Sequence, residues 1–552
     1  MRRSFFAFSL LFSFIFLFSC ADRQPRIHSI NPRIGMMGEV LTILGENFGD
    51  TREESYVTIA GISPTTLSYI EWSDTRILIQ IPEFGNSGLV YVYRDDKKSN
   101  SALFSNRTTM PQTIQGEYTG IGPRIITVEP QIGQIGSAIT IRGNGFGASR
   151  EGGGVFFAWN TEPSSSAAAG LSGPVSVEVS ETEFGYELWS EREIRVRVPD
   201  GAIGGNLTIQ TPRGNTRPVF FDIAAKPGTK TFKEKRNYAI SYSVDIQVEK
   251  AGSPNSLYLW FPRPVNSSSQ RNAQILFRTM EPFIENYRGT TLFQVKDVQS
   301  DTNMGITLSY LVEVYAVETT IRSNSVTLVS PDPSPIKAAY TTANSRLPAD
   351  NPRIKELTAS LVGREQNPYI RAQRIYEYLL NQGGIQWPLP GETPEEALSP
   401  EGLLEALEKK KADPYTATLL FCTMARSAGI PTIPVSGVLL DRNRTFSRHY
   451  WAEFWIDGFG WVPVDVALGA GAVPPSFILR ADRANYYFGN LDSQRITFSR
   501  GFTTLSQMDP RGRVSVRERN YALQNIWEEA VGGLESYSSL WSDVTINGVY
   551  YQ

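Results

Sequence analysis

The residues of this chain whose types and spacing could support catalysis lie in two segments near its C-terminal end. The first segment, ADPYTATLLFCTMARSAGIP, spans Ala412 to Pro431 and contains Cys422. The second, RHYWAEFWIDGFGWVPVDVALG, spans Arg448 to Gly469 and contains His449 and Asp465. A cysteine, a histidine and an aspartate together can support nucleophilic catalysis, because the histidine activates the thiol and the aspartate orients the imidazole ring.

Such chemistry depends on the elements that hold the three side chains. A thiolate is favoured when its cysteine stands at the N-terminus of a helix beside a histidine. The aspartate is best placed on the strand next to that of the histidine. Here an Asp457-Gly458 pair separates the strand-like segment that begins at His449 from GWVPVD, which ends at Asp465. A tight turn at this pair predicts a hairpin that brings Asp465 close to His449.

Together the two segments resemble the core of the transglutaminase-like superfamily, papain-like enzymes that use Cys, His and Asp. The resemblance extends from Pro352 to Gly501 and includes a closing segment, YYFGNLDSQRITFSRG. It implies an α+β core in which helices precede the sheet, and it maps the catalytic His and Asp onto His449 and Asp465. In this family the nucleophilic Cys begins a helix that ends in Arg-x-x-Gly-Ile-Pro, here Arg426 to Pro431.

The family spacing leads back from that ending to Pro414, where the nucleophile would stand. Asp413 is a suitable N-cap, and proline is tolerated best at the first helical position. Cys422 lies eight residues further on, ~12 Å along a helix at ~1.5 Å per residue. Its apolar neighbours favour a small buried hydrophobe over a nucleophile. We therefore interpret His449 and Asp465 as a vestigial pair.

The hydrophobic pattern around these segments agrees with helices followed by strands. Apolar residues have helical spacing in 354–361, in 368–380 and in 403–407. Strand-like runs follow in 435–440 and 450–464.

An internal repeat occupies the N-terminal part of the chain. NPRIGMMGEVLTILGENFG (31–49) recurs as EPQIGQIGSAITIRGNGFG (129–147) at an offset of 98 residues. WSDTRILIQIP (72–82) recurs as WSEREIRVRVP (189–199) at an offset of 117. The second copy therefore contains an insertion of 19 residues, which we place in the Gly/Ser/Ala-rich stretch from Gly152 to Gly173.

Both copies have the pattern of small all-β domains. Alternating apolar residues predict strands, and glycines between them predict turns. A Gly-x-x-Phe turn stands at Gly45 to Phe48 and again at Gly143 to Phe146. Both copies resemble the IPT/TIG domain, an immunoglobulin-like β-sandwich, and we assign them to 25–106 and 123–223. Such domains are mostly spacers or binding modules, so the fold names no ligand.

Two further β-rich regions are predicted. Alternation in 238–248 and 306–314 indicates strands, and residues 230–330 resemble the β-sandwich that often precedes bacterial transglutaminase-like cores. Residues 502–552 form a C-terminal β-rich extension. With the transglutaminase-like domain at 352–501, the predicted fold class is multidomain, with two immunoglobulin-like sandwiches, a further β-sandwich and an α+β papain-like core.

The N-terminus has the features of an export signal. Arg2 and Arg3 precede an apolar run from Phe5 to Phe18 that is shorter than the ~20 residues of a membrane span. Leu-Phe-Ser-Cys at its end is similar to the bacterial lipobox, in which the cysteine carries lipid. We expect residues 1–19 to be a lipoprotein signal peptide and Cys20 to be acylated; the alternative is an ordinary signal peptide.

Composition limits the other classes of function. The 552 residues carry a net charge of −3 and no long basic run beyond the N-terminus, which disfavours nucleic-acid binding. With only two cysteines and two histidines, a Cys/His zinc site is almost excluded, and we expect no cofactor and no metal.

The main hypothesis is an exported lipoprotein of the bacterial cell envelope, held at the membrane by acylated Cys20. Its transglutaminase-like domain would have lost catalysis and would bind a protein or peptide in the old substrate groove. One alternative is an active hydrolase or acyltransferase with a non-standard nucleophile. Another is an assembly scaffold that acts through the IPT/TIG domains.

Overall fold

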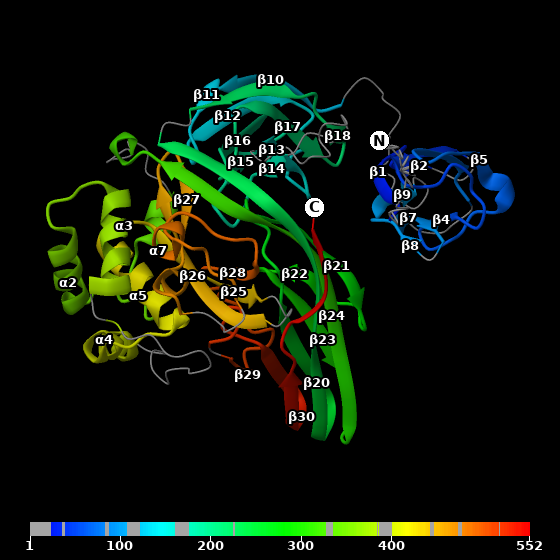
Figure 1. Cartoon of the computed structure of the whole chain (residues 1–552). Helices are drawn as coiled ribbons and strands as arrows, with labels where there is room; N and C mark the ends of the chain where they lie inside the picture. Colours follow the sequence, from blue (N-terminus) through cyan, green and yellow to red (C-terminus); the bar gives the residue numbers. More distant parts are fainter. Residues whose placement is uncertain are drawn as a thin grey trace, which may run out of the picture. The chain divides into compact units, whose positions relative to one another are not determined.

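The computed structural model of the chain describes residues 24–35, 39–82, 88–95, 97–106, 122–159, 176–224, 227–326, 335–382, 385, 400–441, 446–472, 477–517 and 519–551. These residues fall into two compact units, one containing the described residues up to 106 and the other those from 122 onward (Figure 1). The predicted signal peptide and Cys20 lie outside the described residues. No described helix is long and apolar enough to cross a membrane.

The first unit is a sandwich of two sheets in which most strand pairs are antiparallel. One sheet has the order β1 (Arg26–Asn31), β3 (Val40–Glu46), β6 (Arg76–Gln80), β5 (Tyr69–Trp72). The other has the order β2 (Ile34–Gly35), β9 (Ala102–Asn106), β7 (Gly88–Arg94), β4 (Tyr56–Ile59), with β8 (Lys97–Lys98) paired to β7. Every second side chain of β3 and β6 points inward, and Ile43, Ile79 and Val92 are fully buried between the sheets.

The second copy of the repeat has the same two-sheet arrangement. Its first sheet has the order β10 (Arg124–Glu129), β12 (Ala138–Asn144), β16 (Glu193–Arg197), β15 (Tyr186–Trp189). Its second sheet has the order β11 (Ile132–Gly133), β19 (Val219–Ile223), β17 (Gly205–Thr211), β13 (Gly154–Ala158), β14 (Ser176–Glu178), with β18 (Gly214–Asn215) paired to β17. Most of the predicted insertion lies outside the described residues, but β14 is an edge strand that the first copy lacks.

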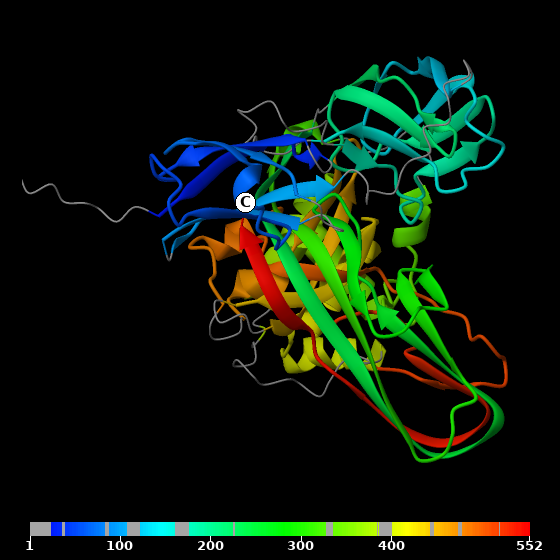
Figure 2. The ribbon, with the colours of Figure 1, turned by 90° about the vertical axis from the view of Figure 1, so that its right-hand side faces the viewer.

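The region predicted as a separate β-sandwich differs from the expectation. It forms one sheet of eight strands, and strands of the C-terminal stretch complete it. Its centre is β20 (Gly228–Pro262), the long curved strand of Figure 2. Along one side β20 pairs with β24 (Thr302–Ile321) and β23 (Thr290–Lys296), and along the other with β30 (Glu528–Trp541) and β31 (Thr545–Tyr551). The remaining strands are β21 (Gln270–Arg278), β22 (Ile284–Tyr287) and β29 (Arg513–Ser515).

The α+β core follows the predicted order of helices before sheet. Its first helical elements are α1 (Pro335–Tyr340), α2 (Pro352–Val362), α3 (Pro368–Glu377), a π-helical turn (Tyr378–Gln382), α4 (Pro400–Lys409) and α5 (Pro414–Ser427). The sheet has the order β27 (Gly460–Val464), β26 (Phe446–Ile456), β25 (Thr432–Leu440), β28 (Arg495–Arg500), and the short helices α6 (Val466–Ala470) and α7 (Arg483–Tyr486) follow β27. Helix α5 packs on β26 and β25, with α2 and α3 beside it (Figure 1).

The second sandwich copy shares a hydrophobic core with this α+β domain. Ile135 of the copy belongs to one buried cluster with Trp455 and Trp461 of the β26–β27 hairpin. Gly136 lies so close that a Cβ there would stand 2.6 Å from the ring of Trp455. These contacts join the second copy and the core into one unit.

Candidate functional site

Helix α5 begins as its sequence predicts. Asp413 is the N-cap, and its Oδ1 accepts a hydrogen bond of 2.8 Å from the backbone N–H of Thr416. Pro414 occupies the start of the helix, where its missing N–H leaves no hydrogen bond unmade. At the other end, Gly429 adopts a φ of 79°, a left-handed conformation that suits glycine after a helix.

The predicted hairpin is present and brings the histidine and aspartate together. β26 and β27 pair from Ala452↔Val464 to Ile456↔Gly460. His449, on β26, lies with Nε2 2.8 Å from Oδ2 of Asp465. Asp465 follows β27 and caps α6, because its Oδ1 accepts a 3.0 Å hydrogen bond from the N–H of Leu468.

Two further charged residues complete this cluster, and sequence reasoning did not find them. Arg495, on β28, donates from Nη1 to the same Asp465 oxygen at 3.0 Å and from Nη2 to Oδ2 of Asp492 at 2.8 Å. The side chains of His449 and Asp465 are 2% and 0% exposed, and that of Arg495 is 4% exposed. The aspartate therefore binds an arginine as well as the histidine, inside the protein.

The electrostatics keep Asp465 ionised. Burial acts most strongly and would raise the pKa of its carboxyl. The charge and hydrogen bond of His449, the charge of Arg495 and the N–H of Leu468 together outweigh burial, so the pKa of Asp465 lies below its ordinary value. The pKa of Asp492 is lowered in the same way, because Arg495 outweighs its burial.

A segment from the C-terminal stretch lies over the start of α5. Arg519 Nη1 is 3.3 Å from Oδ2 of Asp413, and its guanidinium lies 5.3 Å from the ring centroid of Tyr415. The hydroxyl of Tyr450 donates a 2.9 Å hydrogen bond to the carbonyl of Asn520. The end of the helix at which the family places its nucleophile is therefore in contact with the chain's own Arg519, and Asn520 is bonded to the neighbouring strand β26.

Cys422 is not part of this cluster. Its side chain is fully buried in the apolar core around α5. Burial raises the pKa of its thiol to about 12, although Arg426 acts in the opposite direction. A thiol in this environment remains protonated at neutral pH and is a poor nucleophile.

The described residues thus assemble a buried histidine–aspartate pair without a nucleophile in the first turn of α5. Tyr415 and Thr416 in that turn carry only hydroxyls, and Pro414 carries no reactive atom. Within the described ranges no group of three or more His, Cys, Asp or Glu is arranged to hold a metal ion.

A helix packed on an antiparallel sheet, with a histidine on one strand and an aspartate directly after the neighbouring strand, is the arrangement that the resemblance to papain-like cores implies. Residues 355–466 match the sequence model of the transglutaminase-like superfamily, and residues 25–109 match that of the IPT/TIG domain. The chain therefore contains a transglutaminase-like domain and an IPT/TIG domain.

Several known proteins are similar to parts of the chain. An uncharacterized protein of Haemophilus influenzae is 26% identical over 305 residues, which is 48% of this chain and 78% of that protein. The cyclomaltodextrin glucanotransferase of Paenibacillus macerans is 25% identical over 92 residues, 17% of this chain and 13% of that enzyme. A solved structure of a proposed cysteine protease from Cytophaga hutchinsonii has 13% identity and a TM-score of 0.37, covering 58% of this chain and 93% of that one.

Proposed function

We propose that this protein is an exported lipoprotein of the bacterial cell envelope whose transglutaminase-like domain binds a protein or peptide and does not catalyse. The observation that carries the proposal is Pro414 at the N-terminus of α5. A papain-like mechanism needs a thiolate at that position, next to the histidine. Proline supplies no nucleophile, and Cys422 is buried with a raised pKa.

Two further observations support the loss of catalysis. Arg495 binds the Asp465 oxygen that also contacts His449, so this carboxylate has a structural partner that does not depend on a reaction. Arg519 contacts the N-cap Asp413 and lies over Tyr415 in the first turn of α5. We infer that binding takes place outside the old substrate groove.

The test measures acyl transfer and thiol reactivity on the full chain. Purified protein is incubated with a glutamine-containing peptide and a fluorescent amine, and separately with a fluorescent thiol-reactive probe. We expect no amine incorporation, no peptide hydrolysis and no labelling of Cys422 in the native protein. Turnover by the wild type that disappears in a folded His449→Ala variant would overturn the proposal and favour an active enzyme with a non-standard nucleophile.

A gain-of-thiol variant provides the matched comparison. In Pro414→Cys the new thiol stands at a helix N-terminus, an environment that lowers a thiol pKa. We expect the probe to label this cysteine at least tenfold faster than Cys422. Pro414→Ser, which places a hydroxyl where Pro414→Cys places a thiol, is the control and should remain unlabelled by the probe.

The membrane anchor has a separate test. Cells expressing the full chain are fed an alkyne-tagged fatty acid, and the protein is recovered from the membrane fraction. We expect label in the wild type and none in Cys20→Ser, which should also leave the membrane fraction. Equal labelling of the two would remove Cys20 as the acylated residue.

A further inference from the structure

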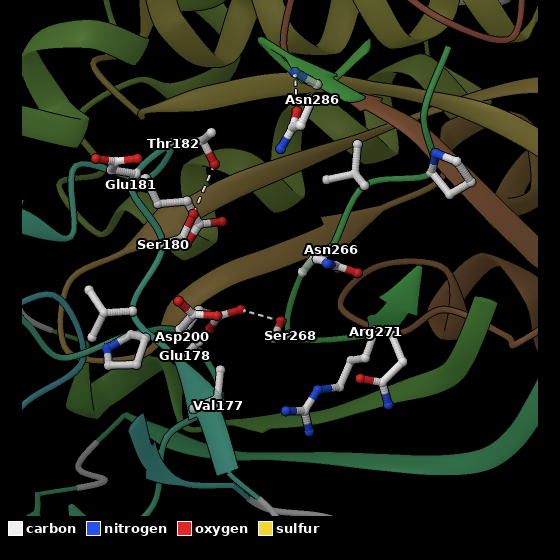
Figure 3. Close-up of a pocket in the computed structure, with 18 of the residues that line it drawn as sticks. Val177, Glu178, Ser180, Glu181, Thr182, Asp200, Asn266, Ser268, Arg271 and Asn286 are labelled. Carbon is white, nitrogen blue, oxygen red and sulfur yellow. Dashed lines mark hydrogen bonds between the residues drawn. The ribbon is translucent and has the colours of Figure 1, made fainter. Parts of the chain in front are cut away.

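A cleft of about 600 Å³ lies between the second sandwich copy and the eight-stranded sheet, apart from the His449 cluster. One wall comes from the copy and includes β14 and the loop that follows it, with Glu178 and Ser180. The opposite wall comes from the segment before β21 and from β21 itself, with Asn266 and Arg271 (Figure 3). Asn286, beside the β22–β23 turn, lines a third side.

The two walls are fixed to each other by buried charges. Asp200 of the copy binds Lys230 of β20, and its Oδ2 accepts a 2.8 Å hydrogen bond from Ser268 (Figure 3). Glu183 binds Arg500 of β28, which fixes the same wall to the sheet of the α+β core. These carboxylates are occupied, so their role is to hold the walls of the cleft in place.

Three charged residues that line the cleft, Glu178, Arg271 and the exposed Arg288, have no ion-pair partner among the described residues, and Arg288 donates instead to the carbonyl of Thr504. No basic group of the described residues lies within 4.0 Å of the Glu178 carboxylate, and no described carboxylate lies within 4.0 Å of the Arg271 guanidinium. Burial by surrounding atoms raises the pKa of the Glu178 carboxyl, with Arg150 opposing this and Glu181 adding to it. Burial also lowers the pKa of Arg271. Each group would gain from a ligand of opposite charge.

Arg271 is held in a defined orientation. Its Nη2 donates to the carbonyl of Ser176, and its guanidinium stacks 4.2 Å from a ring centroid of Trp159. These contacts use one face and one edge of the guanidinium and leave further N–H groups for a ligand, since the group has five donors. A fixed guanidinium loses less entropy on binding a carboxylate than a mobile one.

The rest of the lining is suited to amide groups. The side-chain oxygens of Asn266 and Asn286 accept backbone hydrogen bonds from Ala273 and Gly289, which leaves their NH₂ groups as donors. Phe156 is the single aromatic residue among the described lining residues. A carbohydrate site would be expected to offer more aromatic surface for its sugar rings.

We propose that this cleft binds a short peptide that carries both a cationic and an anionic group, with the cation at Glu178 and the carboxylate at Arg271. The inference rests on the proposed binding function and gives that function a site. The comparison of the two copies also supports a binding role for this cleft. Strand β14, which carries Glu178, has no counterpart among the described strands of the first copy.

The experiment uses the full chain and four pools of end-blocked pentapeptides. One pool carries one Lys and one Glu at varied positions, one carries only Lys, one only Glu, and one carries neither. Equilibrium dialysis followed by mass spectrometry measures retention of each pool. We expect the zwitterionic pool to be retained at least tenfold more than each of the others, and this preference to weaken as salt is raised.

Variants then assign each charge to its residue. Glu178→Gln, on a solvent-accessible side chain, should lose the preference for Lys and keep that for Glu. Arg271→Gln should lose the preference for Glu and keep that for Lys. Arg271→Lys, which keeps the charge, is measured as well in case the Gln variant does not fold. Glu129→Gln and Arg124→Gln, on exposed positions of β10, are the matched controls and should behave as the wild type.

Equal retention of the four pools, or a zwitterionic preference that survives in both cleft variants, would overturn the proposed site. Such a result together with absent acyl transfer would leave the proposed non-catalytic function intact. Acyl transfer by the wild type would overturn that function, whatever the pools show, so the two failures are distinguishable.

Discussion

The two copies of the repeat have the same internal framework and differ in what their surfaces contact. In the first copy the Tyr69 hydroxyl accepts the N–H of Val57, and Trp72 Nε1 donates to the carbonyl of Phe48. The equivalent bonds in the second copy are Val155 to Tyr186 and Trp189 to Phe146. Residues that make these bonds recur in the sequence because each sandwich requires them.

The differences lie on strand faces and loops that the framework does not restrict. The first copy bears Tyr56, Tyr91 and Tyr93 on the outer face of β4 and β7, where the second has Gly154, Thr208 and Gln210. The second copy instead contributes Asp200, Glu183 and the edge strand β14 to contacts with the core and to the cleft. The repeat signature therefore specifies a sandwich, and residues outside the signature decide what that sandwich joins.

The largest expected difference concerns ion pairs. Asp200→Ala removes the carboxylate of a buried pair with Lys230, whose ammonium also donates to the carbonyl of Trp461, so we expect a loss of about 3–5 kcal/mol in the stability of the second unit. In the first copy, Glu46→Ala removes a pair with Arg26 whose side chains are 47% and 69% exposed, and we expect about 0–1 kcal/mol. Hydrogen exchange measured on peptides of both units reports the two effects separately. Equal losses would contradict the assignment of Asp200 as an anchor.

Acidification should also affect the stability of the two units differently. Asp465 and Asp492 in the second unit have lowered pKa values. Their contribution to stability is present above the pKa of an unfolded aspartate, about 3.9, and is lost as the pH falls through their lower folded values. Asp465→Asn should therefore cost about 3–5 kcal/mol at neutral pH, since it leaves the buried His449 and Arg495 without this charge.

The cost of Asp465→Asn should shrink as the pH falls below about 4. Denaturant unfolding at a series of pH values measures it, with Asp457→Asn, on a turn of the same hairpin, as the control. A cost that does not change with pH would show that the carboxylate is not the source of the stability.

Whether a contact of the fold or of the candidate site could be predicted from the sequence depends on how far apart the two contacting residues lie along the chain. The repeat and the His449–Asp465 pair were predictable, because local turns and a short hairpin bring those residues together. The binding of Arg495 to Asp465 was not, since it depends on where β28 pairs in the sheet. The extent of β20 and its pairing with β30 were also missed, because alternation predicts a strand but not its neighbour.

Substitutions at an equivalent glycine test whether the two frameworks are the same. A Cβ on Gly45 would stand 2.1 Å from the carbonyl oxygen of Arg26, and one on Gly143 would stand 2.1 Å from that of Arg124. Alanine at either position forces a backbone shift, and we expect each change to cost about 1–3 kcal/mol in its own unit. Hydrogen exchange in single variants measures both. Costs that differ by more than about 1 kcal/mol would mean that the close approach is not equally important in the two copies.

The smallest expected effect concerns the outer faces of the sandwiches. Tyr56 and Tyr93 stack across β4 and β7 with ring centroids 4.7 Å apart. Tyr93→Gln, which places the second copy's residue in the first, removes this cross-strand pair and should cost about 0.5–1 kcal/mol. The reverse change, Gln210→Tyr, has Gly154 and not a tyrosine directly opposite on the neighbouring strand, so it should remain within about 0.5 kcal/mol of the wild type. A gain in stability from Gln210→Tyr would show that a tyrosine at this position stabilises the sandwich even without a second tyrosine opposite. The stacked Tyr56–Tyr93 pair would then not account for the difference in stability between the outer faces of the two copies.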